Sequence, residues 1–286
     1  MEYTITIPEN HPEKEELEKV IKALLDFLPL HSIYLSLNDN SFSPNTIITL
    51  RLSKELEIDA MDVKPFVSRL FRNYPKFSYT LFEHWWAVDL WDAGSLFLIN
   101  HATGDKLAYS LNPPEKAFRL KNNKEARKRI RNAKNEYALL DGYAYNCSIY
   151  SKWLRQAGNY LLAAFHLHQA IKFSFQKAEL ILMGEYLASQ SLVEHQIYMA
   201  EFYPEFGVFF DNQNKDEYNI LKQLDNSYRI VLHNKKNKQD FTEEMIALAT
   251  AKSVQISTRA HAIFEGSVTE CKKKIKNIEA KNNPSS

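Results

Sequence analysis

Residues 157–202 read AGNYLLAAFHLHQAIKFSFQKAELILMGEYLASQSLVEHQIYMAEF, and this stretch decides the fold of the C-terminal half. Apolar residues recur in it at steps of three and four, which is the spacing of one face of an α-helix. They are Ala164, Leu167, Ile171, Phe175, Ala178 and Leu182. The spacing predicts a core-facing helix of about 26 residues that ends at Gly184, and a shorter helix over 191–203.

The helical pattern extends in both directions from this stretch. Residues 216–232 repeat the apolar spacing, and a last helix is expected from the N-cap Thr242 to residue 279. Upstream, residues 116–150 contain no proline and predict a connecting helix. Residues 151–280 are therefore expected to form an all-α bundle.

The N-terminal part, residues 1–115, has a different character. Helical spacing appears over 12–28 and 62–71, whereas short apolar runs bounded by turn formers predict strands. The expected strands are 32–37, 46–52, 77–83, 95–99 and 106–110. The fold class is thus α+β, a small mixed α/β domain followed by helices.

The bulk composition excludes several classes of protein. Only seven of the 286 residues are glycine, and no two lie closer than ten residues apart, so neither GxGxxG nor GxxxxGK[ST] occurs. The net charge is +1, and no apolar run reaches the 18 residues that suggest a membrane span. The acidic N-terminus lacks the apolar segment of a signal peptide, and the two cysteines do not suggest a disulfide framework. We expect a cytoplasmic protein.

Residues 150–265 resemble HEPN domains, which are small helical bundles of nucleotide-binding proteins. The matching positions are Ala164-Phe165, His168-Gln169-Ala170, the small residue Gly184, the His195 that leads the second helix, and LDNSY at 224–228. A nucleotidyltransferase-like domain often accompanies such a bundle, and residues 1–115 are similar to one in order and size.

An active nucleotidyltransferase needs a Gly-Ser turn that leads into a helix, with an Asp-x-Asp pair for Mg²⁺ about ten residues further on. Here Gly94-Ser95 precedes the expected strand over 95–99, and Asp105 stands without a partner. We therefore expect a degenerate nucleotidyltransferase-like domain without transferase activity.

The resemblance also implies a candidate ribonuclease site. HEPN ribonucleases need no metal and use an Arg with a His a few residues later, usually across a homodimer. Arg229 and His233 lie on one helix face, although their spacing is one residue shorter than in the family and the apolar Ile230 follows Arg229. The alternative is that Arg229 is a solvated helix residue and His233 interacts with the helix dipole.

His168 and Gln169 are further candidates for binding nucleotide or RNA in a groove of the bundle. The alternative is that they form hydrogen bonds to neighbouring helices. His166 and His168 point about 200° apart on a helix and cannot share one metal ion. We expect neither a metal nor a cofactor.

A basic run lies between residues 116 and 134, with nine positive charges against the single negative charge of Glu125. Such a run can contact a phosphate backbone without reading sequence, and it can equally be a solvated helix face. The candidate RNA-binding residues in it are Arg127, Lys128, Arg129 and Arg131. A second cluster comprises Lys272, Lys273, Lys274 and Lys276.

These observations lead to two functional hypotheses. The first is a HEPN protein that binds nucleotide or RNA as a homodimer away from membranes. Its catalytic version is a metal-independent endoribonuclease of toxin–antitoxin or defence type. The second is a non-catalytic module for dimerisation and protein interaction.

Overall fold

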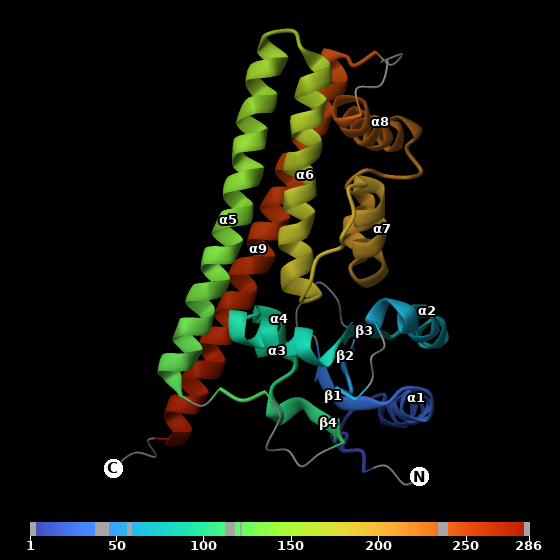
Figure 1. Cartoon of the computed structure of the whole chain (residues 1–286), viewed down its shortest axis with the longest axis vertical. Coiled ribbons are helices and arrows are strands. Elements are labelled where there is room, and N and C mark those ends of the chain that lie inside the picture. The colour runs from blue at the N-terminus through green and yellow to red at the C-terminus, as the bar shows by residue number, and fades with distance from the viewer. Residues whose placement is uncertain are drawn as a thin grey trace. The chain divides into compact units, whose positions relative to one another are not determined.

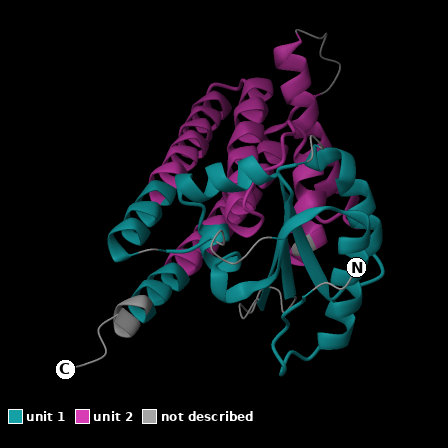
Figure 2. Ribbon diagram, turned by 60° about the horizontal axis from the view of Figure 1, so that its bottom comes forward, with its two compact units in different colours: residues 1–133, 269–286 teal, residues 134–268 magenta. Residues whose placement is uncertain are grey.

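The computed structural model describes residues 4–37, 46–55, 59–111, 118–120, 122–233 and 240–282. The chain divides into two compact units, residues 1–133 with 269–286 and residues 134–268 (Figure 2). The division runs through two long helices, α5 (Asn123–Gln156) and α9 (Glu243–Asn282), so each helix belongs partly to each unit. The described strands all lie before residue 111 and helices follow, which confirms the predicted α+β class.

The described strands of the first unit form a four-stranded sheet in the order β3-β2-β1-β4. The central strand β1 (Leu30–Leu37) runs antiparallel to both β2 (Thr46–Leu52) and β4 (Leu107–Ser110). β2 is parallel to β3 (Phe77–Phe82), and helix α2 (Ala60–Phe71) makes the crossover that a parallel pair requires. Four of the five predicted strands are therefore confirmed.

Helices α1 (Lys14–Phe27) and α2 cover one face of this sheet (Figure 1). Leu17, Ile21 and Leu24 of α1 are almost fully buried against alternate strand residues such as Ile33 and Ile48. This alternation follows from the two-residue period of a strand, which sends every second side chain to the same face. The main apolar core of the first unit lies here.

The other face of the sheet contacts α3 (His84–Ala93) and α4 (Leu96–His101), which precede the 3-10 turn η1 (Gly104–Lys106). The predicted strand over 95–99 is wrong, because these residues begin α4. Ser95 caps that helix by accepting a hydrogen bond from the Leu98 amide at 3.3 Å. The run is buried on every side, so its apolar pattern could not distinguish a helix from a strand.

The second unit consists of helices packed along α6 (Tyr160–Leu182). α7 (Leu192–Phe202) and α8 (Lys215–Leu232) contact α6 and each other, and the short turn η3 (Pro204–Val208) joins them (Figure 1). The predicted apolar stripe is confirmed as core, since five of its six residues are buried and only Leu182 is partly exposed. Lys177 Nζ of α6 contacts Asp141 Oδ1 of α5 at 2.6 Å.

A fully buried polar pair fixes the connection between α6 and α7. His195 Nδ1 lies 2.7 Å from Glu179 Oε1, and neither side chain is exposed to solvent. The other carboxylate oxygen accepts the Leu187 amide at 3.0 Å, and His195 Nε2 donates to the Ser189 carbonyl at 3.2 Å. These bonds satisfy polar groups that burial would otherwise make costly.

None of the helices within the described ranges combines the length and apolarity that crossing a membrane demands.

Candidate nucleic-acid interface

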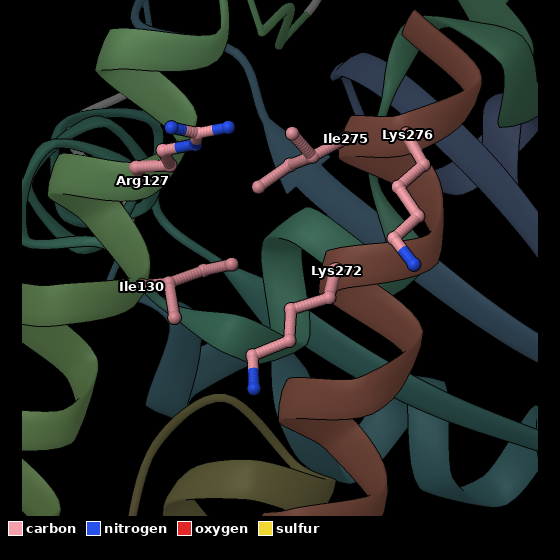
Figure 3. A pocket seen from close by; sticks show the side chains of 5 residues that line it. All are labelled: Arg127, Ile130, Lys272, Ile275 and Lys276. Atoms are coloured by element: carbon pink, nitrogen blue, oxygen red, sulfur yellow. The ribbon is translucent and has the colours of Figure 1, made fainter. Parts of the chain in front are cut away.

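The first unit brings together two of the basic clusters noted in the sequence. The N-terminal part of α5 lies beside residues 269–282 of α9, and a cleft of about 280 Å³ opens between them (Figure 3). Arg127 and Ile130 line it from α5, and Lys272, Ile275 and Lys276 line it from α9 (Figure 3). Residues 145 positions apart in the sequence thus share one basic cleft.

Local sequence explains this arrangement on both helices. In each, an isoleucine follows a cation by three residues, as in Arg127 with Ile130 and Lys272 with Ile275. Residues three apart lie on neighbouring positions of one helix face. Both isoleucines are buried at the base, with 7% and 6% of their surfaces exposed, while the cations extend towards solvent.

Further cations widen the basic surface around the cleft. We call this set the α5–α9 basic surface: Lys124, Arg127, Lys128, Arg131, Lys272, Lys273 and Lys276, all exposed. Glu270 pairs with Lys273 at 2.7 Å, whereas no carboxylate of the described residues forms an ion pair with Lys272 or Lys276. Such a concentration of like charge favours an anionic partner.

Arg129 faces the opposite way, into the first unit. Its guanidinium binds Glu125 Oε1 at 2.7 Å, Asp92 Oδ1 at 3.2 Å and the carbonyl of Trp91, and it lies 4.6 Å from the Trp91 ring centroid. Only 9% of its side chain is exposed. Arg129 therefore holds α5 to α3 and does not belong to the basic surface, unlike its predicted companions Arg127, Lys128 and Arg131.

Lys274 also turns inward from its cluster. Its ammonium donates to the carbonyls of Ile99 and Asn100 at 2.9 and 2.7 Å, which satisfies acceptors at the end of α4. Burial lowers the pKa of this lysine. One cation from each predicted cluster thus stabilises the fold, and the others form the surface.

Arg229 and His233 lie at the C-terminal end of α8, and both are exposed. The His233 amide donates to the Arg229 carbonyl at 3.1 Å, so the two residues stand one helical turn apart. Neither side chain has a hydrogen bond or ion pair to another described residue. The predicted ribonuclease pair is therefore accessible, and its catalytic role stays a prediction.

His168 and Gln169 take part in a hydrogen-bond network inside the second unit. His168 Nε2 donates to the Gln190 carbonyl at 2.9 Å and lies 3.2 Å from Asp225 Oδ1, while Nδ1 accepts from the Gln169 amide at 2.9 Å. His168 is completely buried, and this burial lowers its pKa despite the opposing effect of Asp225. Burial thus favours the neutral form of the ring, and both of its nitrogens are used within the protein.

Asp225 extends the same network to the start of α7. It accepts hydrogen bonds from Ser191 Oγ at 2.6 Å and from the Leu192 amide at 2.7 Å. Burial alone would raise the Asp225 pKa, but the bonds from His168, Ser191 and Leu192 outweigh it and lower the pKa. An anion at a helix N-terminus is also favoured by the helix dipole. The network therefore anchors α7 and α8 on α6.

Gly94-Ser95 does lead into a helix, α4, but the backbone amides of both residues already donate hydrogen bonds within the protein. The Gly94 amide binds the carbonyls of Leu90 and Trp91, and the Ser95 amide binds Leu90, so the pair ends α3. Gly94 has φ +99°, and a Cβ at this position would lie 2.4 Å from the Arg129 carbonyl oxygen. No group of three or more His, Cys, Asp or Glu suited to a metal ion occurs within the described ranges.

Neither comparison of the sequence with known proteins returns a relative: no protein-family model matches the chain, and no curated protein matches it significantly.

Proposed function

We propose that the protein binds RNA through its phosphate backbone, using the α5–α9 basic surface. The observation that carries this proposal is the basic cleft, where Arg127, Lys272 and Lys276 converge from two helices. Lysine and arginine bind phosphates by releasing condensed counterions, and this requires no base-specific contact. The resemblance of residues 150–265 to HEPN bundles of nucleotide-binding proteins is consistent with the same function.

Salt dependence distinguishes this proposal from a protein-interaction module. The affinity for a fluorescein-labelled 20-nucleotide RNA is measured by fluorescence anisotropy at several salt concentrations. For single strands the logarithm of the binding constant falls with the logarithm of salt at a slope of about −0.7 per neutralised phosphate. We expect a steep slope for the natural protein, because seven exposed cations surround the cleft.

A matched pair of double variants localises the binding. Lys272→Ser with Lys276→Ser removes two cations of the cleft, whereas Lys19→Ser with Lys22→Ser removes two exposed lysines of α1. We expect the first variant to bind more weakly and to lose about 1.4 from the magnitude of the slope. The second should behave as the natural protein. Equal effects of the two variants, or a natural protein that does not bind RNA at low salt, would refute the proposal.

A further inference from the structure

The cleft between α5 and α9 has an apolar floor beneath its cations. Among the described residues, Ile130 of α5 and Ile275 of α9 supply this floor. Their side chains point into the cleft from opposite helices (Figure 3). The charge comes from Arg127, Lys272 and Lys276, which line the same cleft. Apolar surface and positive charge are therefore combined within one hollow.

This combination exceeds what a site for phosphate alone requires. A phosphate group binds through its oxygens, and an isoleucine floor offers no hydrogen-bond donor to them. Cations on an exposed helix face neutralise a phosphate backbone equally well without any hollow. The apolar floor therefore indicates a ligand that has an apolar part next to its negative charge.

One nucleotide of an RNA strand has both parts side by side. The two faces of its base are apolar, and charged phosphates flank it on the backbone. The cleft has a volume of about 280 Å³. A cavity of about 150 Å³ already accepts a benzene ring, so this cleft has room for a pyrimidine or purine base, whereas a base pair needs more. We propose that the cleft takes one unpaired RNA base between Ile130 and Ile275, while the surrounding cations hold the adjacent phosphates.

The inserted base has to be unpaired in the RNA itself. In a duplex the faces of each base are stacked and its edges are paired, so the protein meets mainly phosphates and sugars. Extruding a base from a duplex costs unstacking and unpairing free energy, which a single strand, a loop or a bulge avoids. The inference rests on the proposed function and narrows its ligand from RNA in general to RNA with unpaired bases.

Three fluorescein-labelled ligands separate base contacts from phosphate contacts. They are a 20-nucleotide oligouridine, an abasic strand of equal length in which hydrogen replaces every base, and a 20-base-pair RNA duplex. Oligouridine and the abasic strand carry the same phosphates, so a difference in affinity at one salt concentration reports the bases. In fluorescence anisotropy we expect the natural protein to bind the abasic strand at least about fivefold more weakly, the low end of what one base contact contributes.

Filling the cleft tests where the base binds. Ile130→Phe places a ring in the hollow and leaves every cation in position, so it should weaken oligouridine binding at least about fivefold while the abasic strand and the duplex keep their affinities. Ile197→Phe is the matched control, because Ile197 is an exposed residue of α7 in the second unit, and it should bind all three ligands as the natural protein does. Ile275→Thr keeps a branched side chain but makes the floor polar, and it replaces Ile130→Phe if that variant does not fold.

The possible results distinguish this inference from the proposed function. If the natural protein binds oligouridine and the abasic strand equally, each with a steep salt dependence, RNA binding stands and the inserted base is overturned. The same conclusion follows if the floor variant binds oligouridine as tightly as the natural protein, or weakens all three ligands to the same extent. A natural protein that binds none of the three at low salt would instead refute RNA binding itself.

Discussion

Replacing Gly94 by alanine tests whether the Gly-Ser pair is structural or binds a ligand. Gly94 ends α3 at φ +99°, where an L-residue costs about 1–2 kcal/mol. Its new Cβ would lie 2.4 Å from the Arg129 carbonyl oxygen, a distance at which the backbone must move. Overpacking of this kind costs about 1–3 kcal/mol. We therefore expect Gly94→Ala to lower the free energy of unfolding by about 2–5 kcal/mol.

Urea unfolding followed by tryptophan fluorescence measures this change, because Trp85, Trp86 and Trp91 lie in the first unit. Gly142→Ala is the matched control, since its Cβ would meet nothing within 4 Å inside a helix. It should stabilise the protein by up to about 1 kcal/mol, the difference in helix propensity between the two residues. A Gly94→Ala protein within about 0.5 kcal/mol of the natural one, a change typical of neutral surface sites, would refute the reasoning.

Three further predictions address the second unit and the thiols. His168 and Asp225 both have pKa values below their ordinary 6.5 and 3.8, so stability should fall as pH drops below about 6.5 and again below about 4. Melting temperatures across pH 7 to 3 check this: His168→Gln should make the upper step smaller and Asp225→Asn should make the lower step smaller, and because each side chain shifts the pKa of the other, each substitution should also displace the remaining step. If RNA binding includes cleavage, the natural protein should cut labelled RNA in the absence of metal. The Arg229→Ala/His233→Ala variant should cut it at least about tenfold more slowly, because acid–base catalysis is lost. Equal rates for the two proteins would contradict the catalytic role. Cys271 is buried and its pKa is raised to about 12, whereas Cys147 is partly exposed although burial raises its pKa too, so Ellman's reagent should titrate one thiol in the folded protein, and Cys147→Ser should remove that signal.

The elements that could be predicted are those with a strong local pattern. The stripe from Ala164 to Ala178 repeats at the helical period over several turns, so α6 followed directly from it. The segment Leu96–Ile99 is short and entirely apolar, so its pattern shows neither the period of a helix nor that of a strand. Burial from all sides comes from tertiary packing, which no local window contains.

The candidate site also depends on tertiary packing that the local sequence does not show. The charge of residues 116–134 and 272–276 was visible in the sequence, but their meeting at one cleft depends on the packing of α5 and α9. In the sequence, Arg129 could not be distinguished from Arg127, Lys128 and Arg131. Its contacts with Asp92 and Trp91 arise from tertiary packing, which the sequence does not show. The alternation of polar and apolar residues in Ser32-Ile33-Tyr34 is typical of a strand with one face exposed to solvent, yet tertiary packing buries Ser32 and Tyr34 as well.

The contribution of α9 to the first unit constrains when that unit can form during synthesis. Cys271 Sγ donates to Asn100 Oδ1 at 3.1 Å, across a separation of 171 residues. At translation rates of roughly 5–20 residues per second, about 10–35 s pass between the synthesis of these two residues. During that interval the sheet and α4 exist without the helix that completes them. The second unit is translated in full before the residues that complete the first unit leave the ribosome.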